Sequence, residues 1–184
     1  MSGRGTNSKT VADLLPKAAQ LYGPNVAVKY KEGDQWLSKT FAEVQEIVMP
    51  LALGLVELGI QKGDRVSILG NTRPEWTYFD FAALSIGATV VPIYQTNSPE
   101  ECRYVLENSD SKVVIVEDAE QLEKVRAVRD QLPRLEQIVI MTGEAEDALS
   151  MDALAAKGSG DARRGRQTSL PLSARGSNRK SGRQ

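Results

Sequence analysis

Histidine is missing from the 184-residue sequence, and its absence excludes several kinds of site. Without an imidazole there is no histidine general base, no Ser/His or Cys/His nucleophile pair and no histidine-ligated metal. Cysteine is almost as scarce, because Cys102 is the only one. A single cysteine cannot form an intramolecular disulfide or join a second thiol around zinc, so a reducing cytosol is the expected setting.

Long apolar runs are also absent. No stretch approaches the roughly 18 uninterrupted apolar residues of a membrane span, and residues 1–10 have no apolar segment behind their charges. The chain is therefore expected to be soluble and cytoplasmic, without a signal peptide or a transmembrane segment.

Charge is unevenly distributed along the chain. Residues 1–156 contain 15 Lys and Arg against 23 Asp and Glu, whereas residues 157–184 contain 8 against 1. Residues 155–184 are rich in Gly, Ser and basic residues and carry little apolar surface, so this basic tail is expected to be disordered, as are residues 1–9. The tail has no aromatic residue for base stacking, and no specific nucleic acid is expected as a partner.

The remaining residues, 10–154, have the pattern of an α/β domain. A short helix from Thr10 and a hairpin around Gly33 come first, followed by an amphipathic helix that begins at Thr40. From residue 63 onward, four short strands of consecutive apolar residues alternate with helical segments. This alternation predicts βαβ units and a mostly parallel sheet with helices on both faces.

The stretch 70–76 (GNTRPEW) follows the first of these strands, where a phosphate loop would lie. It lacks the glycines of a dinucleotide fingerprint and the Gly-Lys-Ser/Thr ending of a Walker loop. An anion could bind beside Arg73 at the helix N-terminus, but the favoured interpretation is a helix start capped by Asn71, Thr72 and Glu75.

Two other segments are candidate sites. Glu117 and Asp118 end a strand, where a phospho-acceptor or a magnesium ligand would lie, but no second acidic pair completes such a site, and Asp118 is favoured as a helix cap. Cys102 has no histidine to activate it and is expected to be a partly buried structural residue. We therefore predict no catalytic, cofactor-binding or metal-binding residue.

The order of segments over residues 7–154 resembles the N-terminal part of the adenylate-forming (AMP-binding) superfamily, and within it the long-chain acyl-CoA synthetases. The resemblance is carried by residues 63–66 (GDRV), 74–76 (PEW), 87–94 (GATVVPIY) and 98–118. It implies that the α/β unit is an incomplete domain of a long-chain fatty-acid CoA ligase. Full-length members use ATP and magnesium to form an acyl-adenylate, and then transfer the acyl group to CoA.

The sequence departs from that family where the reactive parts begin. The Ser/Thr/Gly-rich phosphate loop ending in Pro-Lys-Gly and the C-terminal domain with its lysine are absent from these 184 residues. We therefore expect an N-terminal fragment that binds no cofactor and is inactive alone. The abrupt change near Ala155 suggests a truncation or a departure from the reading frame.

Two other hypotheses remain open. The chain is alternatively a non-catalytic interaction module that docks on an intact synthetase or uses its tail on an acidic partner. For the fragment itself, an uncovered strand edge and uncovered apolar helix faces predict poor solubility or self-association. A stand-alone doubly wound binding domain unrelated to lipids is the third hypothesis, and it requires the resemblance to be chance. Acyl-chain preference is not encoded in the matching region.

Overall fold

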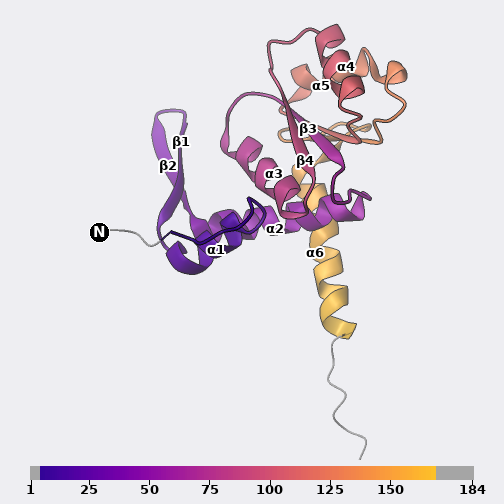
Figure 1. Cartoon of the computed structure of the whole chain (residues 1–184). Coiled ribbons are helices and arrows are strands. Elements are labelled where there is room, and N and C mark those ends of the chain that lie inside the picture. The colour runs from indigo at the N-terminus through magenta and orange to yellow at the C-terminus, as the bar shows by residue number, and fades with distance from the viewer. Residues whose placement is uncertain (1–4, 169–184) are drawn as a thin grey trace, which may run out of the picture.

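The computed structural model describes residues 5–168, with side chains as far as residue 160 (Figure 1). It is an α/β fold whose main feature is a five-stranded sheet in the order β4-β3-β5-β6-β7. All neighbouring strands in this sheet are parallel. The strands are β3 (Arg65–Leu69), β4 (Thr89–Ile93), β5 (Val113–Val116), β6 (Gln137–Ile140) and β7 (Leu149–Ser150).

The prediction of four parallel strands is confirmed by β3, β4, β5 and β6. The fifth strand, β7, has only two residues and is too short to produce a periodic pattern in the sequence. The chain passes from β3 to β4 on one side and then returns to the other side of β3 as β5. This reversal creates a topological switch point between the carboxyl ends of β3 and β5.

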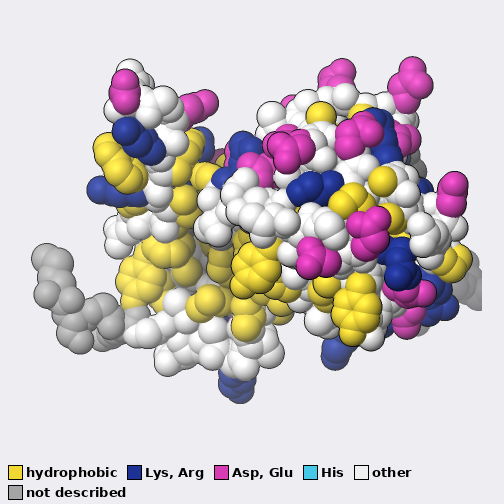
Figure 2. All heavy atoms as spheres, turned by 90° about the horizontal axis from the view of Figure 1, so that it is seen from above, with side chains coloured by type: hydrophobic (Ala, Val, Ile, Leu, Met, Phe, Trp, Pro, Cys, Tyr) yellow, Lys and Arg dark blue, Asp and Glu magenta, His cyan; other side chains and the backbone are white. Residues whose placement is uncertain are grey.

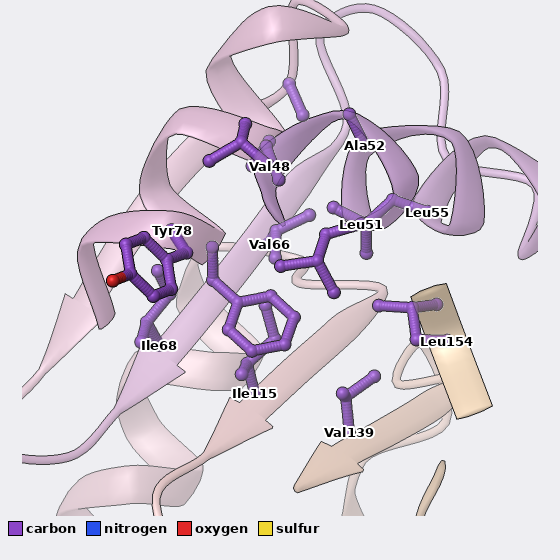
Figure 3. Close-up of a cluster of buried hydrophobic side chains, with 14 of the residues drawn as sticks. Val48, Leu51, Ala52, Leu55, Val66, Ile68, Tyr78, Ile115, Val139 and Leu154 are labelled. Carbon is purple, nitrogen blue, oxygen red and sulfur yellow. The ribbon is translucent and has the colours of Figure 1, made fainter. Parts of the chain in front are cut away.

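Helices cover both faces of the sheet, as the apolar strands predicted. In β5, Val113 and Ile115 join one buried cluster, whereas Val114 and Val116 join another. Figure 3 shows the first cluster, in which side chains of α2 lie over those of β3, β5 and β6. The helices are α2 (Phe41–Glu57), α3 (Pro74–Ser85) and α6 (Met151–Thr168) for the first cluster, and α4 (Pro99–Asn108) and α5 (Ala119–Arg126) for the second. The short 3-10 helix η1 (Arg129–Gln131) follows α5.

The predicted N-terminal helix is α1 (Leu14–Tyr22), which begins after Asp13 and not at Thr10. The predicted hairpin is formed by β1 (Val26–Glu32) and β2 (Gln35–Thr40). The two strands are antiparallel and turn at Gly33, whose φ of 57° favours glycine. The hairpin stands apart from the five-stranded sheet (Figure 1). Residues 5–9, which were expected to be disordered, contact α1 through Lys17, whose Nζ donates to the Asn7 carbonyl at 3.0 Å.

Two of the predicted capping boxes fix the starts of helices. At α2, the Thr40 hydroxyl accepts from the Glu43 N–H at 3.3 Å, while the Glu43 carboxylate accepts from the Thr40 N–H at 2.7 Å. Ser98 and Glu101 make the same reciprocal pair at the start of α4. These local sequence signals therefore determine where both helices begin.

The GDRV segment, residues 63–66, connects two strands at their amino-terminal ends. Asp64 accepts a hydrogen bond from Lys112 at 2.9 Å, and this contact lowers the pKa of the Asp64 carboxyl below its usual value. Arg65 Nε donates to the Ser109 carbonyl at 2.6 Å. Since Lys112 and Ser109 both lie just before β5, the segment ties β3 to β5 at the end of the sheet opposite the switch point.

The expected disorder from residue 155 is wrong for residues 155–168, because α6 continues through them. Leu154 is fully buried and Gly158 is buried where α6 crosses α2, and the second half of α6 projects away from the sheet (Figure 1). One buried leucine and several small residues are enough to pack α6 against α2, because the backbones of the two helices approach closely. The expectation for residues 169–184 lies outside the described residues.

None of the helices described is long and apolar enough to span a membrane.

Candidate functional site

The candidate site lies at the topological switch point, where open parallel sheets usually bind their ligands. The loop after β3, residues 70–73, lies here beside Glu117, which follows β5. Both segments were singled out in the sequence, but as separate candidates. The fold brings them together because β3 and β5 are neighbours whose ends are in register.

Glu117 is the centre of this site. Its carboxylate accepts hydrogen bonds from the main-chain N–H of Asn71 at 2.6 Å and from the Asn71 side-chain amide at 2.9 Å. The other carboxylate oxygen lies 3.5 Å from Arg73 Nη1. The Glu117 backbone is held as well, since its N–H donates to the Leu69 carbonyl and its carbonyl accepts from the Thr142 N–H, both at 3.0 Å. Glu117 thus joins the ends of β3, β5 and β6.

Gly70 makes this approach possible. A Cβ atom at residue 70 would lie 2.7 Å from the Glu117 Cβ and 3.0 Å from its Oε2. Any side chain would therefore push the loop away from the carboxylate. The glycine allows two backbones to approach, but it does not form a phosphate cradle.

The predicted cap of α3 is wrong in detail. The helix begins at Pro74 with Arg73 as its N-cap, and no side chain caps it. Glu75 pairs with Arg73 at 2.6 Å and does not reach back to Thr72. The helix starts one residue later than a cap at Thr72 would place it. Pro74 fits the first helical position, and the residue before a proline favours an extended backbone.

The charge of Arg73 is already balanced by two neighbouring carboxylates. Its guanidinium contacts the carboxylates of Glu75 and Glu117, and the Glu75 hydrogen bond raises the pKa of Arg73. Pro74, the first residue of α3, has no N–H to donate. The arrangement therefore supports the structural interpretation of residues 70–76 over the anion site.

The second candidate, the acidic pair after β5, is divided between two structural roles. Glu117 holds the loop after β3, and Asp118 caps α5 by accepting from the Gln121 N–H at 3.1 Å. The predicted cap is confirmed. Over the residues that the structure describes, no three Asp, Glu, Cys or His side chains are grouped to hold a metal ion.

Cys102 has the structural role that the sequence suggested. Its side chain is fully buried on α4 within the second core cluster, and burial raises the pKa of the thiol. A protonated, inaccessible thiol is a poor nucleophile. The side chains of the basic tail from residue 161 onward lie outside those described.

An open cleft of about 740 Å³ separates the hairpin from this site. Figure 2 shows the hollow between the hairpin and the rest of the molecule, with hydrophobic side chains along it. Its charged lining is balanced, with three basic and three acidic residues: Lys29, Lys31, Arg73, Glu32, Glu75 and Glu117. A balanced lining gives no preference for a phosphate-bearing ligand.

Replacing Glu117 by alanine is expected to lower the free energy of unfolding by about 1.5 kcal/mol, because hydrogen bonds to a charged acceptor are lost from Asn71 and Arg73. Urea unfolding measures the change. The matched control is Glu136→Ala, which removes an exposed glutamate without a side-chain partner among the described residues. Equal losses in the two variants would contradict the role given to Glu117.

The comparisons with known proteins agree with this fold. Residues 15–173 match the model of the family described as AMP-binding enzyme. The chain is 36% identical over 138 residues to the long-chain-fatty-acid–CoA ligase ACSBG2 of Xenopus laevis, covering 75% of this chain and 19% of that protein. It is 40% identical over 114 residues to the long-chain-fatty-acid–CoA ligase FadD15 of Mycobacterium bovis, covering 62% of this chain and 19% of that protein.

Solved structures show the same likeness. The anthranilate CoA ligase AuaEII, in complex with anthranoyl-AMP, superposes with a TM-score of 0.72 at 27% identity, covering 80% of this chain and 28% of that one. A long-chain-fatty-acid-CoA ligase from Archaeoglobus fulgidus gives a TM-score of 0.69 at 23% identity over 81% of this chain and 30% of that one, which supports the fold. The chain spans about a fifth of the length of the curated relatives that it matches. With its parallel sheet, its switch-point loop and a family match over most of its length, the chain belongs to the AMP-binding enzymes.

Proposed function

We propose that this chain supplies part of the scaffold of a cytoplasmic long-chain fatty-acid CoA ligase and forms no acyl-adenylate by itself. The proposal rests on its similarity to the long-chain-fatty-acid–CoA ligases of Xenopus laevis and Mycobacterium bovis. In such an enzyme ATP, magnesium, a fatty acid and CoA would be the substrates and cofactors.

The observation that carries the proposal is the mutual pairing of the polar groups at the switch point. The Glu117 carboxylate accepts from Asn71 and contacts Arg73, and α3 starts with a proline. Activating a carboxylate with ATP needs donors and a cation around the departing pyrophosphate. The residues present do not fit a triphosphate, and the sequence has no phosphate loop ending in Pro-Lys-Gly.

The test is an assay of pyrophosphate release from ATP with magnesium, palmitate and CoA. A full-length long-chain-fatty-acid–CoA ligase is the positive control, and we expect release only from that enzyme. The proposal would be overturned if this chain released pyrophosphate in a palmitate-dependent reaction and if that activity stayed with the protein through two purification steps.

A second candidate function is docking on an intact synthetase or on another copy of the chain. It is favoured by the large apolar side chains exposed on and beside α1 and α2: Val11, Leu14, Leu21, Met49 and Val56. Contiguous exposed apolar surface commonly marks an interaction site. Co-purification of an intact synthetase with this chain would support docking, and a monomer that captures no synthetase would contradict it.

A further inference from the structure

Strand β4 forms an open edge of the five-stranded sheet. The sheet ends at β4 on one side and at β7 on the other, and β7 has only two residues before α6 begins. β4 has five residues and pairs with β3 along its whole length. Its other side has no strand partner in the described part of the chain, and Thr89, Pro92 and the following Tyr94 are exposed. An edge of this length is a template on which another strand can pair.

The hydrogen bonds to β3 determine which main-chain groups of β4 face outward. The Thr89 N–H donates to the Asp64 carbonyl at 2.8 Å. Because main-chain groups alternate in direction along a strand, Val91 also faces β3, whereas Val90 and Pro92 face away from it. The main-chain groups of Val90 and Pro92 are therefore the ones that an added strand would meet.

Pro92 stands where the second outward donor of this edge would lie. Proline has no N–H, and a carbon of its ring takes the place of the amide hydrogen. A neighbouring strand, whether parallel or antiparallel, would direct a carbonyl oxygen at this point and would meet the ring instead. Pro92 thus leaves the pairing of β4 with β3 intact and obstructs pairing on the open side.

The residues around Pro92 have the composition that favours association between strands. Residues 89–94 read TVVPIY, in which five residues are β-branched or aromatic and none is charged. Uncharged segments of about six residues with this composition and without proline readily form intermolecular sheets. Pro92 is the one residue of the six that departs from this pattern.

We propose that Pro92 prevents this chain from pairing with a second copy of itself along the open edge of β4. A second copy fits the edge because two copies of β4 related by a two-fold axis lie antiparallel. An axis at Val91 places Val90 of one copy opposite residue 92 of the other, where an N–H would donate to the Val90 carbonyl and the proline ring excludes it. This association differs from docking through α1 and α2, and it does not depend on the proposed ligase function.

The first measurement tests whether the edge is open in the unmodified chain. Hydrogen exchange followed by NMR should show a rapidly exchanging Val90 amide between the slower amides of Thr89 and Val91, which face β3. A Val90 amide as well protected as its two neighbours would mean that the edge is already covered, and the proposal would be overturned.

The second measurement is the association of Pro92→Val, which restores a donor in a residue that favours strands. At roughly 100 μM, its weight-average mass in sedimentation equilibrium should be at least about 1.5-fold that of the unmodified chain, and exchange of the Val90 amide should slow at least about tenfold. Pro133→Val makes the same change at an exposed position outside the strands and should alter neither quantity. A Pro92→Val chain with the mass of the unmodified chain would refute the proposal.

A double variant separates edge pairing from misfolding. Thr89→Lys, added to Pro92→Val, places a charge at an exposed position on the same edge, and charges at such positions keep strand edges apart. The double variant should therefore return to the mass of the unmodified chain. If it stayed associated, the association would come from an exposed core instead of the β4 edge, and the proposal would fall.

Discussion

Replacing Phe79 by alanine is expected to lower the free energy of unfolding by about 4 kcal/mol. The ring is fully buried in the first core cluster, between α3 and the sheet. Its removal loses the transfer free energy of the ring and leaves a cavity, which together cost about 3–5 kcal/mol for a buried aromatic residue. Urea unfolding followed by circular dichroism measures the change.

The matched control is Phe81→Ala, which removes the same side chain two residues later on α3. Phe81 is only partly buried against the cluster, so its loss should cost less than half as much. If the two variants lost equal stability, the assignment of Phe79 to the centre of the core would be wrong. A smaller loss at both positions would show that the core repacks around the gap.

Replacing Gly158 by alanine should destabilise the chain by about 3 kcal/mol, although alanine is the better helix former. A Cβ at residue 158 would lie 2.1 Å from the Pro50 carbonyl oxygen and 2.6 Å from the Gly54 nitrogen. Both are backbone atoms of α2, so the helices must separate. Overpacking of this kind costs about 1–3 kcal/mol and at times more, which exceeds the gain of up to about 1 kcal/mol in helix propensity.

Gly160→Ala is the control on the same helix. A Cβ there would meet no heavy atom within 4 Å, so only the propensity gain remains and stability should rise by up to about 1 kcal/mol. The two glycine variants should therefore change stability in opposite directions. Hydrogen exchange of the α6 amides should become faster in Gly158→Ala alone, and unchanged exchange would contradict the close crossing of α2 and α6.

The candidate site could be predicted only in part. The location of residues 70–76 after a strand and the cap at Asp118 both follow from local pattern. The pairing of Glu117 with Asn71 does not, because the residues are 46 positions apart and nothing in either segment indicates the other. The start of α3 was wrong by one residue for a similar reason, since Glu75 binds Arg73 instead of completing a cap with Thr72.

The sequence by itself determined three features of this protein. They are the succession of strands and helices along the chain, the covering of both sheet faces by helices, and the capped starts of α2 and α4. These features depend on the spacing of apolar residues and on hydrogen bonds between residues three positions apart, which a single chain displays directly. Only the tertiary structure decided what meets across the sheet and between helices. Gly70 against Glu117 and Gly158 against α2 are contacts between distant segments, and these depend on how the backbones pack in three dimensions.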